Sequence, residues 1–95
     1  MYFSIYAKDK LDHLSVRMET RPKHVKYLKK HAEKMLAFGP ILTDEGESPI
    51  GSLLIMNFDN IKQAQEWADG DPYAKAGLFE STEIHAWREL KTKDL

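Results

Sequence analysis

Residues 52–58 read SLLIMNF, and this apolar run constrains the fold more than any other stretch of the chain. Successive side chains of an extended strand point to opposite faces of the sheet. Leu53 and Ile55 therefore share one face, and Leu54 and Met56 share the other. A strand that is apolar on both sides is buried on both sides. The run predicts a strand in a sheet whose two faces must both pack against other elements.

The segments around this strand predict a complete α+β domain. Residues 2–7 alternate strictly, with Phe3 and Ile5 on one face, as a period-two strand requires. The predicted strands are 2–7, 41–43, 52–58 and 79–87, and the predicted helices are 21–37 and the segment between Asn60 and Gly70, with a short helical turn after Asp71. This order of strand, helix, strand, strand, helix, strand is the split βαβ pattern of a ferredoxin-like fold with an antiparallel sheet.

Local signals set the predicted boundaries of these elements. Residues 20–22, Thr-Arg-Pro, mark a helix start, because threonine caps helices and proline is tolerated in a first turn. Residues 39–40, Gly-Pro, mark its end. Gly70 is expected to close the second helix in a left-handed conformation. The polar residues 8–18 are predicted to form a loop, and 44–51 a turn-rich connection between two strands.

Length and composition narrow the class of protein. A chain of 95 residues predicts one domain, residues 1–95. Its net charge of −1 creates no field that attracts phosphate backbones, so nucleic acid is not an expected partner. The absence of cysteine excludes disulfides, thiolate nucleophiles and cysteine-rich zinc sites. No stretch resembles a signal peptide or a membrane span of about 18 apolar residues, so a cytoplasmic location without membrane contact is expected.

The two apolar faces of the sheet also bear on assembly. The helices of a ferredoxin-like domain cover only one face, and Tyr2 and Tyr6 point away from Phe3 and Ile5. The simplest second cover is the sheet of another subunit, which would make a homodimer, a dimeric α+β barrel. The alternative is that these residues line a ligand cavity.

Among the histidines, His24 has the position with the greatest chemical consequence. The predicted helix start puts His24 in a first turn, where unpaired backbone N–H groups create a positive end. That field disfavours the imidazolium, so His24 is expected to be neutral and able to accept a proton. A carboxylate beside it would orient the ring. The alternative is an ordinary capping or surface histidine.

Asp71 is the partner that residue type suggests, since it lies at a Gly-Asp-Pro turn beyond the second helix. Spacing alone does not bring Asp71 to His24, and a plain helix N-cap is the alternative role. Zinc sites need three or four protein ligands in a compact set, and only these two residues qualify. We therefore expect no metal and no cofactor.

Five further residues are candidates for contacting a substrate. Arg17 and Arg21 are suited to holding a substrate carboxylate by paired hydrogen bonds, or else they are solvated. Tyr73 is placed either to close the site or to anchor packing. Ser4 and Tyr6 share a face of the first strand, where they either line a pocket or pack at an interface.

Several motifs resemble the YCII-related (YciI-like) family. The first comprises Arg17 and residues 21–28, which read RP-x-H-x-x-YL. The second comprises residues 64–78, which read AQ-x-WA-x-x-DPY-x-x-AGL. The opening residues 6–10, YA-x-DK, and the passage from Gly39-Pro40 to Gly51 are also similar to that family. The likeness covers essentially the whole chain, and the two motifs together are more specific than either alone.

This resemblance implies a dimeric α+β barrel whose catalytic pair falls on His24 and Asp71. One member of the family that acts in chloroaromatic breakdown is a dehydrochlorinase, and muconolactone isomerases share the general fold. The resemblance therefore favours cofactor-independent isomerisation or elimination, such as dehydrochlorination, of a small anionic organic substrate, with His24 as general base. The alternative is a dimeric module that binds a small molecule without catalysis.

Overall fold

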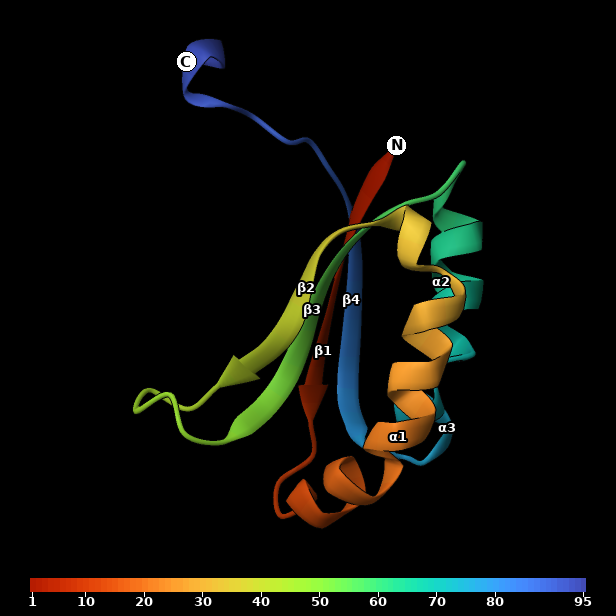
Figure 1. Cartoon of the computed structure of the whole chain (residues 1–95), viewed down its shortest axis with the longest axis vertical. Helices are drawn as coiled ribbons and strands as arrows, with labels where there is room; N and C mark the ends of the chain where they lie inside the picture. Colours follow the sequence, from red (N-terminus) through yellow and green to blue (C-terminus); the bar gives the residue numbers. More distant parts are fainter.

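The computed structural model describes residues 1–95 as a four-stranded antiparallel sheet with all helices on one face (Figure 1). The elements are β1 (Tyr2–Asp9), α1 (Leu14–Lys30), β2 (Met35–Leu42), β3 (Pro49–Asn57), α2 (Ile61–Asp69), α3 (Pro72–Lys75) and β4 (Phe79–Trp87), with 3₁₀ turns at Ala32–Lys34 and Thr92–Asp94. The strand order is β2-β3-β1-β4. The predicted α+β class and ferredoxin-like βαββαβ order are confirmed. None of the helices is long and apolar enough to cross a bilayer.

The hydrophobic core lies between the helices and the middle of the sheet. The register pairs Ile5 with Leu54 and Phe3 with Met56, and all four side chains are buried on the helix side. Trp67 of α2 completes the same core. Alternation in β1 and β3 therefore sorts the side chains between the two faces as the sequence predicts.

The opposite face of the sheet has no cover within the chain (Figure 1). On it Tyr6 lies opposite Leu53 in the register of β1 and β3. Tyr6, Leu53 and Trp87 remain 37%, 41% and 38% exposed. Three large apolar or aromatic side chains on one uncovered sheet face form a patch that a partner can bury. We refer to Tyr6, Leu53 and Trp87 as the open-face patch.

The first helix differs from the prediction at both ends. It begins at Leu14 within the predicted loop, ends at Lys30, and contains Pro22 in its interior. A proline inside a helix removes one hydrogen bond and bends the axis. The first turns of α1 accordingly lie across the end of the sheet, and the rest runs along its face (Figure 1). The prediction failed because Arg17 is buried on the inward face of these turns, and hydrophobic periodicity does not detect a buried arginine.

The second strand was also mispredicted. It starts at Met35, so the end of the predicted helix is strand, and Gly39-Pro40 lies inside β2 instead of ending a helix. Proline is tolerated there because β2 is the edge of the sheet, where one side of the strand needs no ladder partner.

The helix ends around the second motif are specified by side chains. Asn60 caps α2 by accepting a hydrogen bond of 2.9 Å from the Gln63 backbone N–H. Gly70 has φ −84°, so the left-handed conformation predicted for it is wrong. Its small size matters instead, because a Cβ there would lie 2.6 Å from the Tyr27 hydroxyl. That hydroxyl donates to the Trp67 carbonyl at 2.7 Å, so Gly70 permits α1 to approach α2 closely.

Candidate active site

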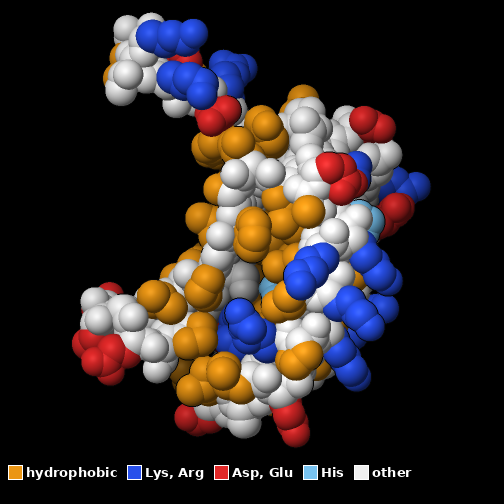
Figure 2. Space-filling view, viewed as in Figure 1, with side chains coloured by type: hydrophobic (Ala, Val, Ile, Leu, Met, Phe, Trp, Pro, Cys, Tyr) orange, Lys and Arg blue, Asp and Glu red, His pale blue; other side chains and the backbone are white.

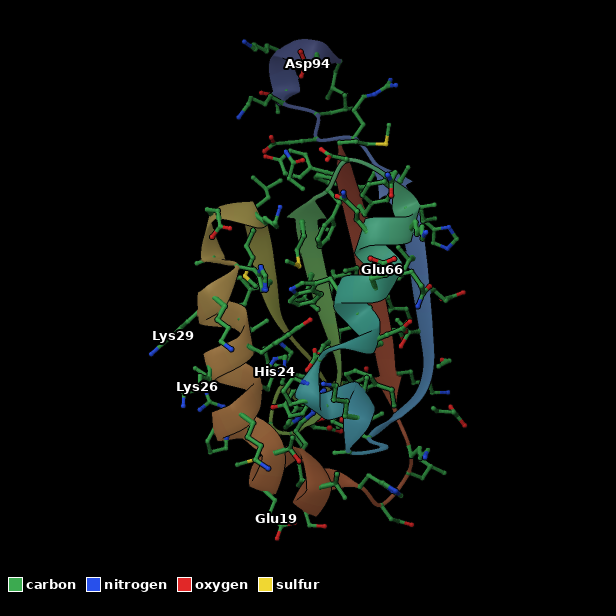
Figure 3. All side chains as sticks on the ribbon, turned by 90° about the vertical axis from the view of Figure 1, so that its right-hand side faces the viewer. Glu19, His24, Lys26, Lys29, Glu66 and Asp94 are labelled. Carbon is green, nitrogen blue, oxygen red and sulfur yellow. The ribbon has the colours of Figure 1, made fainter.

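His24 and Asp71 form a buried hydrogen-bonded pair. They lie 47 positions apart in the sequence, and His24 Nδ1 is 2.9 Å from Asp71 Oδ1. Both residues are at least nine-tenths buried. Figure 3 shows His24 pointing inward from α1, whereas Lys26 and Glu19 of the same helix point outward. The fold therefore joins the two residues that spacing alone could not connect.

Asp71 is held in place by the start of α3. It is the N-cap of that helix, and its Oδ1 also accepts a hydrogen bond of 2.9 Å from the Tyr73 backbone N–H. The N-cap role and the partnership with His24, considered as alternatives from the sequence, are thus combined in one carboxylate. A carboxylate fixed in this way also fixes the ring that it contacts.

The bond to Asp71 determines which nitrogen of His24 is free. A carboxylate only accepts hydrogen bonds, so the proton of the pair lies on Nδ1. In the neutral ring Nε2 then carries a lone pair and can accept a proton. This property does not come from a helix N-terminus as the sequence suggested, because His24 lies well inside α1. Asp71 provides the orientation instead.

Tyr73 forms one wall of the pair. Its ring stacks on the His24 ring with centroids 3.9 Å apart and planes 17° apart. The guanidinium carbon of Arg17 lies 4.7 Å from the centroid of the same ring. Tyr73 is therefore packed between a guanidinium and the candidate base, and it limits how the imidazole can turn.

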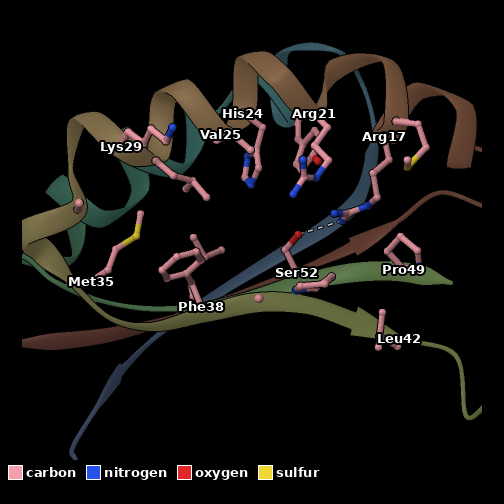
Figure 4. A pocket seen from close by; sticks show the side chains of 17 residues that line it. Arg17, Arg21, His24, Val25, Lys29, Met35, Phe38, Leu42, Pro49 and Ser52 are labelled. Carbon is pink, nitrogen blue, oxygen red and sulfur yellow. Dashed lines mark hydrogen bonds between the residues drawn. The ribbon is translucent and has the colours of Figure 1, made fainter. Parts of the chain in front are cut away.

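Arg17 belongs to a second buried pair beside the first. Its Nε donates to Asp9 Oδ2 at 2.7 Å and its Nη2 donates to Asp9 Oδ1 at 2.9 Å. The same Nη2 also donates to the Ser52 hydroxyl at 2.9 Å (Figure 4). Burial disfavours the charged guanidinium, but the hydrogen bonds and charge of Asp9 outweigh it and raise the pKa of Arg17.

Two tyrosines near the site have hydroxyl pKa values above the usual one for tyrosine. Burial raises the pKa of Tyr73, although the charges of Arg17 and Arg21 oppose the shift. Burial also raises the pKa of Tyr27, and the Asp71 carboxylate adds to that effect. The Tyr73 hydroxyl is therefore a neutral group at physiological pH.

A pocket opens between α1 and the strands β2 and β3. Its volume is about 630 Å³, and its lining includes His24, Arg21, Arg17, Ser52 and Tyr73. Figure 2 shows apolar side chains gathered around this hollow, with a basic group at its lower end. In Figure 4 the side chains of His24 and Arg21 extend from α1 toward the strands. The candidate base thus lies in the wall of a ligand-sized cavity.

The structure brings together most of the residues singled out from the sequence. His24, Arg17, Arg21 and Tyr73 line the pocket, and Asp71 supports it from behind. Arg17 is occupied by Asp9 and Ser52. Ser4 and Tyr6 do not line this pocket, because they alternate onto the other face of the sheet.

Asp9 and Ser52 are the residues beside the candidate site that sequence reasoning missed. Asp9 continues the buried alternation of β1 after Ala7, and a carboxylate in a buried register is a signal for a charged partner. Nothing in the sequence around Ser52 indicated a charged partner. The structure contains no group of three or more His, Asp or Glu side chains that could hold a metal ion.

Fold and site together define a ferredoxin-like α+β domain with a buried His–Asp pair in a basic, largely apolar pocket. The family model of the YCII-related domain matches residues 1–88. The chain therefore belongs to the YCII-related family. Two relatives support this membership. Protein YciI of Escherichia coli is 35% identical to this chain, and the match covers 95% of this chain and 99% of that protein. An uncharacterised protein of Haemophilus influenzae is 32% identical over the same shares.

Solved structures show the same fold. The 5-chloro-2-hydroxyhydroquinone dehydrochlorinase TftG of Burkholderia phenoliruptrix, in complex with 2,5-dihydroxybenzoquinone, matches with a TM-score of 0.86. It is 33% identical, and the match covers 93% of this chain and 94% of TftG. An antibiotic biosynthesis monooxygenase, 8% identical, matches with a TM-score of 0.57 over 96% of this chain and 100% of that chain. The second likeness concerns the fold alone.

Proposed function

We propose that this protein is a cofactor-independent enzyme that removes a proton from a small anionic organic molecule and so promotes elimination or isomerisation. One observation carries the proposal: His24, which Asp71 holds through Nδ1, lies in the wall of the pocket with Nε2 free to accept a proton. A positioned imidazole of this kind contributes about 10²–10⁴-fold to a proton transfer.

The surrounding groups suit the charge changes of such a reaction. When Nε2 takes a proton, the Asp71 carboxylate stabilises the resulting imidazolium. The substrate becomes more negative at the same time. The Arg21 guanidinium lies beside His24, where it can stabilise this negative charge (Figure 4). The buried Tyr73 ring keeps the imidazole in orientation. Proton acceptor and anion binder are therefore adjacent.

The likeness to TftG suggests a first test substrate. We expect the protein to release chloride from 5-chloro-2-hydroxyhydroquinone faster than the uncatalysed reaction does. In His24→Gln, kcat/KM should fall by about 100-fold or more, because the acceptor nitrogen is gone. His13→Gln is the matched control, since His13 lies outside the pocket and should leave the rate unchanged.

The alternative function makes a different forecast for the same experiment. A binding module would bind 2,5-dihydroxybenzoquinone, the ligand of TftG, without chloride release. Binding that survives in His24→Gln together with no turnover in the wild type would replace the enzymatic proposal with that one.

The proposal includes a homodimer formed through the open-face patch. Tyr6 and Leu53 lie opposite each other on an uncovered sheet face, and burying such a patch is favourable. Light scattering should give twice the chain mass of 11.0 kDa. Leu53→Lys should give the single-chain mass, whereas Leu14→Lys, a change of the same type at a 45% exposed position on α1, should not. A monomeric wild type would contradict this part of the proposal.

A further inference from the structure

The pocket is much larger than a single six-membered ring. Its volume is about 630 Å³, whereas an engineered apolar cavity of about 150 Å³ already takes up benzene. Whole drug-sized ligands occupy pockets of about 300–1,000 Å³. One ring, such as the 2,5-dihydroxybenzoquinone bound to TftG, would by this measure fill roughly a quarter of the space. The dimensions favour a longer occupant.

The lining of the pocket changes in character along α1. The polar side chains of the lining, Arg17, Arg21, His24, Ser52 and Tyr73, form one half, which is bordered by Leu42 and Pro49 (Figure 4). The apolar half consists of Val25, Leu28, Ala32, Met35, Phe38 and Leu54. Figure 4 shows Val25, Met35 and Phe38 on the side of His24 that faces the C-terminal end of α1. A rise of about 1.5 Å per residue puts Lys30, the last residue of α1, about 9 Å from His24 along the axis, and Ala32 lies just beyond it.

The charged side chains of the pocket are all basic. None of the lining residues is Asp or Glu. Arg17 is neutralised by Asp9, with which it forms two hydrogen bonds. Arg21 forms no ion pair and lies next to His24 (Figure 4). Lys29 also lines the pocket and forms no ion pair, but it lies farther along α1 from His24 than Arg21 does (Figure 4). Arg21 is therefore the cation that can hold an anionic group beside the candidate base.

From these three observations we infer that the substrate is an elongated amphipathic anion. Its acidic group binds Arg21 beside His24, and a hydrocarbon or aromatic body about 10 Å long lies in the apolar half. The inference rests on the proposed function, because it uses the same site, and it adds the class of substrate. Arg21 determines specificity for the acidic group, whereas Arg17 is held by Asp9 and contacts Tyr73.

A series of 4-alkylbenzoates with no, two, four and six alkyl carbons tests this inference by calorimetry. Each methylene that enters the apolar half should tighten binding by about two- to fourfold, until the half is full. The matching 4-alkylbenzyl alcohols should bind about tenfold more weakly, since they lack the charge. Turnover is not needed for this measurement.

Three variants locate the effect. Ala32→Trp places a large side chain in the apolar half, at an exposed position, and should abolish the dependence on chain length while benzoate binds as before. Arg21→Gln should weaken every acid by about tenfold and leave the alcohols unchanged. Lys26→Gln is the matched control, because Lys26 is a cation of α1 that points outward (Figure 3), and it should change neither.

Two results would overturn the inference: no binding by any member of the series, or an affinity that does not depend on chain length in the wild type. The second result would mean that the apolar half does not take up the body of the ligand. The outcome is independent of the chloride-release experiment. Chain-length dependence without any proton-transfer activity would leave the amphipathic ligand standing and remove the enzymatic proposal.

Discussion

Two buried pairs lie side by side under α1, and they differ in how completely their polar atoms are used. In the Arg17–Asp9 pair both carboxylate oxygens accept from the guanidinium, and Ser52 takes a further donor hydrogen. In the His24–Asp71 pair one ring nitrogen is engaged, and the other ring nitrogen makes no hydrogen bond within the chain. The first pair joins its two side chains through two hydrogen bonds, and the second retains an open acceptor in the wall of a pocket.

This difference separates a structural role from a chemical one. An ion pair held by several hydrogen bonds fixes the elements that carry it, here β1, α1 and β3. A half-used histidine can exchange a proton with a ligand. Tyr73 connects the two pairs, since it contacts the guanidinium and stacks on the imidazole. Substitutions in each pair test whether the two roles can be separated.

The largest effect is expected from breaking the Arg17–Asp9 pair. Asp9→Ala would leave the buried Arg17 charge without its partner, which costs about 3–5 kcal/mol. That is a large share of the stability of a small domain, about 5–15 kcal/mol. Urea denaturation monitored by tryptophan fluorescence measures the loss.

A double variant provides the control for this prediction. In Asp9→Leu combined with Arg17→Met both charges are replaced by apolar side chains, so much of the lost stability should return. If Asp9→Ala alone costs less than about 1 kcal/mol, the pair is not the structural element that its hydrogen bonds suggest.

A smaller effect, on activity alone, is expected from Asp71→Asn. Asparagine caps helices as well as aspartate, so the start of α3 and the unfolding free energy should be kept. The charge that stabilises the imidazolium is lost, and the rate of chloride release should fall by about 100-fold, or about 2.7 kcal/mol. Equal rates in wild type and Asp71→Asn would show that His24 and Asp71 do not act as a catalytic pair.

Ser52→Ala tests the hydrogen bond that Arg17 makes outside its pair with Asp9. It removes one acceptor from Arg17 while Asp9 remains, so a loss of about 1–2 kcal/mol in unfolding free energy is expected. Ser81→Ala, at an exposed position in β4, should stay within about 0.5 kcal/mol of the wild type. A loss at Ser52 as large as that at Asp9 would mean that the hydroxyl, and not the carboxylate, holds Arg17.

The smallest effect concerns alkaline pH. Burial raises the pKa of Tyr73 and of Tyr27 above the usual 10.0. Their contribution to stability is therefore fully present below about pH 10 and is lost as the pH rises through the raised pKa values, because the unfolded chain releases these protons first. The free energy of unfolding should fall from about pH 10 upward, and it should fall less steeply in Tyr73→Phe. The same slope in both proteins would contradict a protonated, buried Tyr73.

Much of this architecture could be predicted from the sequence, from the alternation of apolar residues and from local turn signals. The alternation in β1 and β3 predicted two faces, and the Asp71-Pro72 turn predicted a helix start with an aspartate cap. The start of α1 at Leu14 could not be predicted in the same way. Its inward side carries Arg17 and His24 before Leu28, and Pro22 lies in its interior, so every local signal favoured a later start.

By itself, the sequence determined the class of fold, the faces of the sheet and the residues with chemical potential, because these follow from spacing along the chain. Only the tertiary structure decided which of those residues meet. His24 and Asp71 are 47 positions apart, and Arg17 and Ser52 are 35 apart. Contacts at such distances depend on how α1, α3 and the sheet pack together, and no local rule specifies that packing. The same packing leaves Arg21 free and commits Arg17 to Asp9, which residue type alone could not distinguish.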